Sequence, residues 1–471
     1  MKKSNLIVVL GAGESGVGAA LLAKSKGLNV FVSDASIIKP NFRKELEENN
    51  IPFEEGQHTL KLLREAELVI KSPGISPYLP YIQDLLAQGI PTYSEIEFAY
   101  QFVTAAKIIA VTGTNGKSTT VSLIYHILKQ ANWNVQLGGN IGYSFARLLL
   151  QKEPQWYVLE VSSYQLEFIQ KFRPNIALIL NLYPHHLERY NNQLSLYAKA
   201  KFNIFKNQVA EDFFIYGCYS PLLVQELAKA KYLSQPLCFG WEPREELNAW
   251  FDGNSICFHM KKDKPKGAKT IKIPIDEAQS RSKSFIYNSM AAGLVGNLLD
   301  IKKESIRNSF MTFENLEHRL ERVCEIEGVE FINDSKATNV NSAWFALEQM
   351  NRNVIWVVGG KDTGTSDFGM LFPLVKEKVK ALILLGREVE RIAEAFSGIG
   401  KPMFKVDSMQ MAVQKAFSLA ERGEVVLLSP ACPSFDMFEN FEERGNAFKA
   451  EVKKLLAEVE LKNNLSTKKQ E

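Results

Sequence analysis

The sequence predicts an α/β protein of three domains built on parallel sheets, in which the first and last domains are Rossmann-like and the middle one is of the P-loop type. Short apolar strands alternate with helical patterns along most of the 471 residues. Two of the strand–turn–helix units carry glycine-rich turns, at residues 11–16 and 113–119. At roughly 100–200 residues per domain, the length allows about two to four domains.

Composition excludes several other classes of protein. Lys and Arg number 56 against 53 Asp and Glu, a net charge of +3, which argues against a surface devoted to nucleic acid or anionic membrane. No window of about eighteen uninterrupted apolar residues is present, so we expect no membrane insertion. The five cysteines are scattered without a CxxC pair, which disfavours a disulfide framework or zinc site and favours a reducing cytoplasm.

The first predicted strand, residues 6–10, leads into the turn Gly11-Ala12-Gly13-Glu14-Ser15-Gly16. This GxGxxG pattern allows a tight turn and a close approach of the backbone to a phosphate, and the helix N-terminus that follows favours the anion. Asp34 follows the second strand, residues 30–32, where its carboxylate could accept a ribose hydroxyl. A third short strand covers residues 68–70. The pattern indicates a nucleotide or diphosphate without identifying it, and a plain βα turn is the alternative.

A second unit begins with the strand 108–111 and the turn Thr112-Gly113-Thr114-Asn115-Gly116-Lys117-Ser118-Thr119. The turn departs from the strict Walker A pattern because Val111 stands where a glycine is required. The strand before it and the helical pattern of residues 118–131 after it nevertheless match a P-loop. Backbone N–H groups would cradle ATP phosphates, Lys117 would neutralise them, and the Ser118 hydroxyl would bind Mg²⁺. The sequence therefore predicts ATP binding.

Two more polar residues follow strands of this region. Glu160 comes after the strand 156–159, and His186 lies just past the strand 176–180. Ligands of open parallel sheets gather at the carboxyl ends of strands, so we expect both side chains to face Lys117. Carboxylate and imidazole groups can ligate a Mg²⁺ that bridges phosphates. Without the P-loop they would be interpreted as a surface carboxylate and a polar loop.

The character of the chain changes between about residues 207 and 285. Residues 249–258 place Asp-Gly between strand-like flanks, which predicts a hairpin. Residues 261–269 hold five lysines among polar residues, which is typical of a solvated loop.

A third α/β unit opens near Phe331, with strands at 353–358, 381–385 and 425–428. Two clusters of small hydrogen-bond donors and acceptors stand out. One covers residues 333–339, and the other covers residues 429–436, directly after the last strand. Each cluster alone is typical of a helix cap or a turn.

Together these motifs resemble the Mur ligase family, the ATP-dependent amide-bond ligases of peptidoglycan precursor synthesis, over nearly the whole chain. The matching pieces are residues 11–16, 72–75, 113–119 (the family's own form of P-loop), 138–142, 160–167, 333–339 and 428–432. The likeness is greatest to the branch that adds D-glutamate. It implies domains at residues 1–96 for the UDP-linked substrate, 97–315 for ATP and magnesium, and 316–471 for the amino acid.

The resemblance also implies a reaction. ATP would phosphorylate the terminal carboxylate of UDP-N-acetylmuramoyl-L-alanine to give an acyl phosphate, which the amine of D-glutamate would attack. A carboxylate is a poor electrophile, and phosphorylation activates it. Lys117 and magnesium would offset the charge on the transferring group. We expect a cytoplasmic monomer whose partners are these small molecules.

Site residues are implied position by position. Ser118 and Glu160 would hold one Mg²⁺, and His186 would help hold a second, supported by Lys201 carried as a carbamate, with Lys199 as the neighbour to compare. The implied ATP contacts are Gly113, Thr114, Asn115, Gly116, Lys117, Ser118, Thr119, Asn288, Arg319 and Asp334, with His318 near the last two. The implied contacts of the UDP-linked substrate are Ser15, Asp34, Ser72, Gly74 and Asn140. Those of D-glutamate are Lys336, Thr338, Ser434 and Phe441.

Four positions depart from the family pattern: His185 replaces a usual aspartate, Ser284 a histidine, Thr363 a common lysine, and Ser36 an arginine of some relatives. They weaken the substrate assignment more than the reaction type, and Lys361 could compensate for Thr363. The alternatives are a family member that adds another amino acid, a folylpolyglutamate synthase, an NAD-dependent oxidoreductase that uses the first glycine-rich turn, and a non-catalytic nucleotide-binding scaffold. The early turn and the Ser72-Pro73-Gly74 motif disfavour the folate enzyme. Lys117, Glu160 and His186 disfavour the other two classes.

Overall fold

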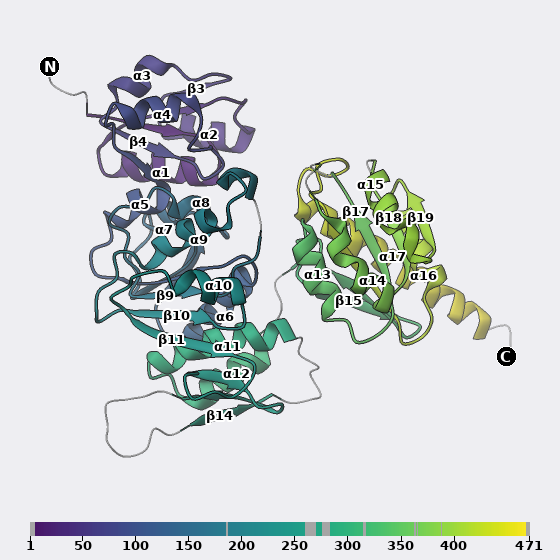
Figure 1. The fold of residues 1–471 in the computed structure, drawn as a ribbon. Coiled ribbons are helices and arrows are strands. Elements are labelled where there is room, and N and C mark those ends of the chain that lie inside the picture. Colours follow the sequence, from purple (N-terminus) through teal and green to yellow (C-terminus); the bar gives the residue numbers. More distant parts are fainter. Residues whose placement is uncertain are drawn as a thin grey trace. The chain divides into compact units, whose positions relative to one another are not determined.

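The computed structural model describes residues 5–184, 187–259, 270–275, 283–313, 317–361, 364, 366–387 and 389–467. The chain divides into two compact units, residues 1–313 and 314–471. Within the described residues, the first unit contains two sheets and the second contains one (Figure 1). The predicted α/β class is confirmed, with a parallel-sheet domain around each of the three sheets. No described helix is long and apolar enough to span a membrane.

The N-terminal sheet has the strand order β3-β2-β1-β4-β5, and its neighbouring strands are parallel. Its strands are β1 (Leu6–Leu10), β2 (Asn29–Asp34), β3 (Phe53–Glu55), β4 (Leu68–Lys71) and β5 (Thr92–Ser94), with helices α1 (Glu14–Ser25), α2 (Pro40–Glu48), α3 (Leu60–Glu65) and α4 (Pro80–Ala87). Alternate residues of β1 enter the cores on opposite faces, Val9 with α1 and Val8 with α3 and α4. The strand order reverses at β1, so the glycine-rich turn lies where such sheets bind ligands.

The central sheet has the order β14-β13-β12-β11-β10-β9-β6-β8-β7. Its strands are β6 (Lys107–Thr112), β7 (Val135–Gly139), β8 (Trp156–Glu160), β9 (Ile176–Ile179), β10 (Phe213–Gly217), β11 (Gln235–Gly240), β12 (Ala249–Phe251), β13 (Ser255–Phe258) and β14 (Ile271–Pro274). The helical segments are α5 (Glu95–Tyr100), α6 (Lys117–Gln130), α7 (Phe145–Leu148), α8 (Ser163–Leu166), η1 (Leu187–Tyr190), α9 (Leu194–Phe202), η2 (Asn203–Phe205), α10 (Pro221–Leu227), α11 (Lys283–Leu298) and α12 (Lys303–Thr312). On β6, Ile109 and Val111 pack with α6 and α11, whereas Ile108 and Ala110 join the core on the other face.

The region after residue 207 continues this sheet. Strands β10, β11 and β12 extend it in parallel, and β13 and β14 then complete it with antiparallel pairs. The predicted hairpin at 249–258 is therefore confirmed, with Asp252-Gly253-Asn254 between its strands. The predicted loop at 261–269 lies outside the described residues.

The two sheets of the first unit share one hydrophobic core. Helix α1 of the N-terminal sheet packs on α7 of the central region, and α5 packs on both. Charged groups cross the same contact: Arg147 of α7 pairs with Glu14 of α1 at 2.9 Å and with Glu45 of α2. The predicted boundary after residue 96 falls inside α5, and both boundaries, at 96 and at 315, stay predictions.

The sheet of the second unit has the order β15-β16-β20-β17-β18-β19. Its strands are β15 (Glu321–Ile326), β16 (Val329–Asn333), β17 (Val354–Gly359), β18 (Val379–Leu385), β19 (Met403–Val406) and β20 (Val425–Ala431). Its helical segments are α13 (Val340–Glu348), η4 (Phe368–Leu371), α14 (Phe372–Lys378), α15 (Glu390–Phe396), η5 (Ser397–Ile399), α16 (Met409–Leu419) and α17 (Phe441–Thr467). Trp356 packs on one face with α13 to α15 and Val357 on the other with α16 and α17. The parallel strands β16, β20 and β17 bring their carboxyl-end loops together.

Candidate functional site

The glycine-rich loop after β6 has the conformation of a phosphate-binding turn. Gly116 precedes α6 with φ +83°, a left-handed conformation that favours glycine, and a Cβ there would lie 2.6 Å from Oδ1 of Asn288. Asn288 is buried on α11 and lies against the loop; its contact with ATP stays a prediction. The start of α6 offers backbone N–H groups and the positive end of a helix dipole, which together suit an anion.

Two lysines meet at this loop. Lys117 donates through Nζ to the carbonyl oxygens of Gly113 (3.0 Å) and Thr114 (2.9 Å), and Lys201 of α9 donates to the same Gly113 oxygen at 2.9 Å. Lys201 is only 2% exposed, and burial lowers its pKa well below the ordinary value, with Lys117 lowering it further and Glu160 opposing the shift. Its neighbour Lys199 is exposed. The structure therefore brings Lys201, not Lys199, to the loop.

Ser118, Glu160 and Asn140 form a chain of oxygen and amide groups beside the loop. The Ser118 hydroxyl donates to Oε2 of Glu160 at 2.5 Å, and Nδ2 of Asn140 donates to Oε1 of the same carboxylate at 2.9 Å. Ser118 and Glu160 are buried, whereas Asn140 is exposed. A hydroxyl and a carboxylate are ligands that Mg²⁺ accepts together with waters and phosphate oxygens. Among the described residues, no group of three or more His, Cys, Asp and Glu side chains is arranged to hold a metal.

Asn181 and Tyr197 also hold the loop, and sequence reasoning missed both. Oδ1 of Asn181 accepts the backbone N–H groups of Thr114 (3.1 Å) and Asn115 (2.9 Å). The Thr114 hydroxyl lies 3.2 Å from the hydroxyl of Tyr197, on the same helix as Lys201. Asn181 follows β9 at its carboxyl end, so the rule that drew attention to Glu160 would also have found it.

The N-terminal turn is closed by its own polar groups. The Asp34 carboxylate accepts the N–H of Ala12 at 2.7 Å and that of Ser36 at 2.8 Å, so it braces the glycine-rich turn. The Ser72 hydroxyl donates to the carbonyl of Gly11 at 3.3 Å, and a Cβ on Gly11, whose φ is +89°, would lie 2.7 Å from that hydroxyl oxygen. The glycine-rich turn and the Ser72–Ile75 loop are therefore in direct contact. Ser15 and Gly74 lie on these same two segments.

The second unit assembles the remaining predicted residues at the ends of β16 and β20. Nζ of Lys336 lies 3.5 Å from the ring centroid of Phe441, which opens α17, and Ser434 is buried in the loop after β20. Thr338 lies two residues after Lys336, and its N–H donates to the Lys336 carbonyl at 2.8 Å. Lys336, Thr338, Ser434 and Phe441 thus lie on adjoining loops. A cation, hydroxyls and an aromatic ring are suited to an amino acid with two carboxylates.

Asp334 lies deeper than its neighbours. Its carboxylate accepts the Ser429 hydroxyl at 2.9 Å and the N–H of Leu320 at 3.3 Å, and burial raises its pKa to about 7. His318 is buried beside it with φ +64°, and burial lowers the pKa of its imidazole. Arg319, between His318 and Leu320, is half-buried. Through Leu320, Asp334 therefore holds the segment that carries His318 and Arg319.

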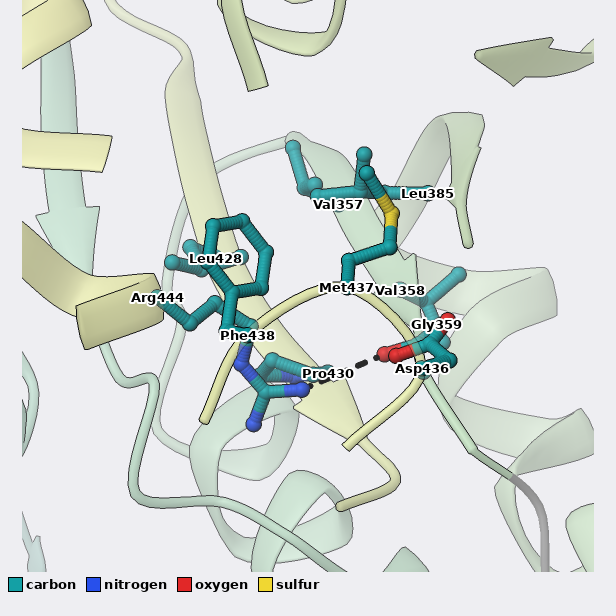
Figure 2. Close-up of a pocket in the computed structure, with 11 residues that line it drawn as sticks. Val357, Val358, Gly359, Leu385, Leu428, Pro430, Asp436, Met437, Phe438 and Arg444 are labelled. Atoms are coloured by element: carbon teal, nitrogen blue, oxygen red, sulfur yellow. Dashed lines mark hydrogen bonds between the residues drawn. The ribbon is translucent and has the colours of Figure 1, made fainter. Parts of the chain in front are cut away.

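Arg444 of α17 connects the three strand-end loops of the second unit, and the sequence analysis overlooked it. Its guanidinium donates to the Ser335 carbonyl (2.9 Å), the Ser335 hydroxyl (3.0 Å) and the Cys432 carbonyl (3.0 Å). Figure 2 shows it directed toward Gly359 at the end of β17, whose carbonyl lies 3.5 Å from Nη1, in a pocket lined also by Asp436. Burial lowers the pKa of Arg444 to about 10. The side chain is only 2% exposed, so it organises the loops from beneath.

Some predicted positions lie outside the described residues, and others lie in the second unit, which does not contain the P-loop. His185, His186 and Thr363 are outside the described residues. Lys361, which could compensate for Thr363, donates its N–H to the Pro433 carbonyl at 2.9 Å. Ser284 is half-buried near the start of α11. Arg319 and Asp334 belong to the second unit, whereas the P-loop residues belong to the first.

Three family models match the chain in succession. They are the Mur ligase MurD-like N-terminal domain at residues 5–94, the Mur ligase middle domain at 111–296, and the Mur ligase glutamate ligase domain at 318–432. A UDP-N-acetylmuramoylalanine--D-glutamate ligase of Christiangramia forsetii is 43% identical over 449 residues, which cover 95% of this chain and 99% of the relative. The enzyme of that name from Bacteroides thetaiotaomicron is 44% identical over 456 residues, with 95% and 99% covered.

Solved structures share the fold. UDP-N-acetylmuramate-alanine ligase MurC from Thermotoga maritima superposes with a TM-score of 0.59 at 18% identity and covers 95% of this chain and 99% of its own. A MurF ligase from Thermotoga maritima in complex with ADP gives 0.55 at 16% identity, with 90% and 95% covered. At these identities the likeness extends to the fold alone.

Proposed function

Because the chain belongs to the Mur ligase family, we propose that it is an ATP-dependent ligase that joins D-glutamate to UDP-N-acetylmuramoyl-L-alanine, in peptidoglycan precursor synthesis. The observation that carries this proposal is the convergence of Lys117, Lys201, Ser118 and Glu160 on one glycine-rich loop. The near full-length likeness to relatives named for this reaction supports the choice of substrates.

The reaction needs a carboxylate made electrophilic. A carboxylate oxygen of the UDP-linked substrate attacks the γ-phosphorus of ATP, ADP leaves, and an acyl phosphate forms. The amine of D-glutamate then attacks the acyl carbon, loses a proton, and expels inorganic phosphate. The backbone of Gly113–Thr119 and the ammonium of Lys117 would hold the phosphates and offset the negative charge that the transfer concentrates there. Asn288, Arg319 and Asp334 would contact the rest of the nucleotide.

Ser118 and Glu160 fit a Mg²⁺ site, because both present buried oxygen atoms beside the phosphate-binding turn. When bound there, the ion would supply positive charge that polarises the phosphoryl oxygens. His186 would help to hold a second Mg²⁺. The Ser118 hydroxyl donates to Glu160 and so keeps the carboxylate turned toward the loop.

Lys201 is suited to carbamylation. Formation of a carbamate requires a neutral amine, whose nitrogen attacks the carbon of CO₂ and then loses one proton. Burial favours the neutral amine of Lys201 by lowering its pKa. The product would be an anion that relieves the repulsion between two ammonium groups on one carbonyl and could support the second metal.

The two remaining substrates would be held on other loops. Ser15, Asp34, Ser72 and Gly74 would receive the UDP part, and Asn140 would reach the muramoyl–alanyl end beside Glu160. Lys336, Thr338, Ser434 and Phe441 would hold D-glutamate. Lys336 would pair with a carboxylate of the amino acid, and Arg444 would keep its loop in place. On this proposal, residues of both units take part in the reaction.

We also propose domains at residues 1–96, 97–315 and 316–471, a monomer, and a cytoplasmic location, since the substrates are small soluble molecules. The main alternative is an enzyme of this family that adds a different amino acid. It is supported by the four departures from the family pattern, at Thr363, His185, Ser284 and Ser36. The oxidoreductase and scaffold alternatives leave the lysines and the acid at the P-loop without a role.

The test is phosphate release from ATP in the presence of UDP-N-acetylmuramoyl-L-alanine, with single amino acids varied. We expect release that depends on D-glutamate. Release with a different amino acid alone would overturn the choice of substrate. Release that needs no UDP-linked compound would overturn the reaction.

A further inference from the structure

A buried lysine and a partly buried arginine, Lys71 and Arg189, bind the loop that follows β4. This loop, Ser72–Ile75, is a turn closed by a hydrogen bond from the N–H of Ile75 to the carbonyl of Ser72 at 3.2 Å. Nζ of Lys71 donates to the carbonyl of Ile75 at 2.7 Å and to that of Ser72 at 3.2 Å. The guanidinium of Arg189 donates to the carbonyl of Ile75 at 3.1 Å and approaches that of Gly74 at 3.5 Å. Three carbonyls of one short turn are thus directed at two cations.

The two cations come from different sheets. Lys71 ends β4 of the N-terminal sheet, whereas Arg189 lies on η1 of the central region. Arg189 is fixed by two hydrogen bonds to the Glu167 carboxylate, at 3.0 and 2.7 Å, and by the face of Tyr164 at 3.9 Å. Its grip on the turn is therefore a contact between the region that carries the P-loop and the region that carries the glycine-rich turn.

Burying these charged side chains costs free energy, because they lose contact with water. The Lys71 side chain is 1% exposed, and those of Arg189 and Glu167 are 9% and 10% exposed. Arg189 pairs with the Glu167 carboxylate, and desolvation together with Arg189 lowers the pKa of Lys71 to about 7 against the opposing charge of Glu167. The hydrogen bond between Ile75 and Ser72 closes the turn without help from the cations. The cations therefore act on its orientation. They fix which way its carbonyls point and where it lies against the glycine-rich turn, which the Ser72 hydroxyl contacts.

We propose that Arg189 and Lys71 are positioning residues that hold the Ser72–Ile75 turn in the shape that receives the UDP-linked substrate and fix it to the P-loop region. This rests on the proposed function, because it takes that turn as part of the UDP site. Neither side chain needs to touch the substrate. A turn held before binding does not have to be ordered during binding, which lowers the free-energy cost of association.

The test uses the full chain with Arg189→Lys, Arg189→Met and Lys71→Met. Arg64→Met is the matched control, because Arg64 pairs with Asp84 on the exposed side of the same N-terminal region. Calorimetry gives the dissociation constants of UDP-N-acetylmuramoyl-L-alanine and of ADP, and steady-state rates give KM and kcat. Thermal melting identifies variants that fail to fold.

We expect Arg189→Met to weaken the affinity for the UDP-linked ligand about tenfold or more. Arg189→Lys should weaken it by a smaller factor, because lysine keeps the charge but lacks the two-pronged guanidinium. The affinity for ADP should change less than twofold in both variants. KM for the UDP-linked substrate should rise while kcat changes less. Unchanged UDP-ligand affinity in folded Arg189→Met and Arg189→Lys would overturn the proposal, as would an equal loss of ADP affinity. If Lys71→Met does not fold, the arginine variants decide alone. A wild-type protein that binds no UDP-linked ligand would overturn the proposed function instead.

Discussion

Lys117 and Lys201 donate hydrogen bonds to the same carbonyl oxygen, that of Gly113, at 3.0 and 2.9 Å. One lysine begins the helix after the loop and the other lies on α9, which is far along the chain. Two ammonium groups at one acceptor repel each other, which adds to the effect of burial on Lys201. The site therefore favours the loss of a positive charge from Lys201.

Replacement of Lys201 tests the proposed carbamate. Lys201→Ala should lower kcat by roughly 10²-fold or more, because an anion that supports the metal site would be absent. Added short carboxylates such as formate or acetate should restore part of the rate. Lys199→Ala, at the exposed neighbouring lysine, should behave like wild type. Equal loss in both variants, or no response to carboxylates, would contradict the carbamate. Lys117→Ala should be inactive with or without them.

Asn181 should govern ATP affinity. Its Oδ1 accepts two N–H groups of the P-loop, so Asn181→Ala leaves both without that acceptor and loosens the loop. At roughly 1–2 kcal/mol for such a loss, we expect KM for ATP to rise about tenfold. Asn175 is the matched control, because its Oδ1 accepts the N–H of Ile108 near the start of β6, the strand that leads into this loop. Asn175→Ala should change thermal stability and leave KM for ATP near wild type; a similar rise in both would mean a general effect.

Arg147 should neutralise a carboxylate within the glycine-rich turn. Nε of Arg147 donates to Glu14 at 2.9 Å, and Glu14 also accepts the N–H of Ser144 at 2.9 Å. Arg147→Met would leave the Glu14 charge unpaired at the N-terminus of α1, where it repels a diphosphate. We expect KM for the UDP-linked substrate to rise several-fold and the second change Glu14→Gln to restore much of it. A double variant no better than Arg147→Met would show that Arg147 acts through packing alone.

Glu95 should make stability depend on pH. Burial raises its pKa to about 8, with Glu14 adding to the shift and the hydrogen bond from Ala146 opposing it. Between about 4.5, the value for the unfolded chain, and about 8, the folded state therefore binds more protons, so stability falls as the pH rises. Glu95→Gln removes this titration, and its denaturant midpoint should fall less than that of wild type between pH 5 and 8. The exposed Glu65→Gln should track wild type; a Glu95→Gln curve parallel to wild type would contradict the shift.

Local signals in the sequence were sufficient to predict the fold class and many of the residues at the P-loop. Strands such as 108–111 and 156–159 are short apolar runs buried on both faces, so periodicity and breakers identify them. Gly116 and Ser118 lie in the turn and at the start of the helix after β6, and Glu160 ends β8, so the sheet rule places them together. Lys201 was reached through family likeness, because an exposed and a buried lysine two residues apart look alike in a sequence.

Other residues could not be found in this way because tertiary packing decides their roles. Arg147, Arg189 and Arg444 are ordinary surface types in sequence. Arg444 becomes buried, and Arg147 and Arg189 partly buried, only where segments distant in the chain meet. Asp34 shows the converse. It was expected to meet a ribose, and in the structure its carboxylate accepts the N–H groups of Ala12 and Ser36. A short acidic side chain can serve backbone and ligand alike, and the sequence does not distinguish them.

An isotope-transfer experiment tests most directly whether the P-loop site activates a carboxylate as an acyl phosphate. UDP-N-acetylmuramoyl-L-alanine with both oxygens of its terminal carboxylate labelled as ¹⁸O is turned over with ATP and D-glutamate, and the inorganic phosphate is examined by mass spectrometry. We expect one ¹⁸O in each phosphate released, because the oxygen that attacked ATP leaves with phosphorus when the amine attacks. Phosphate without label, formed together with the amide product, would contradict this mechanism.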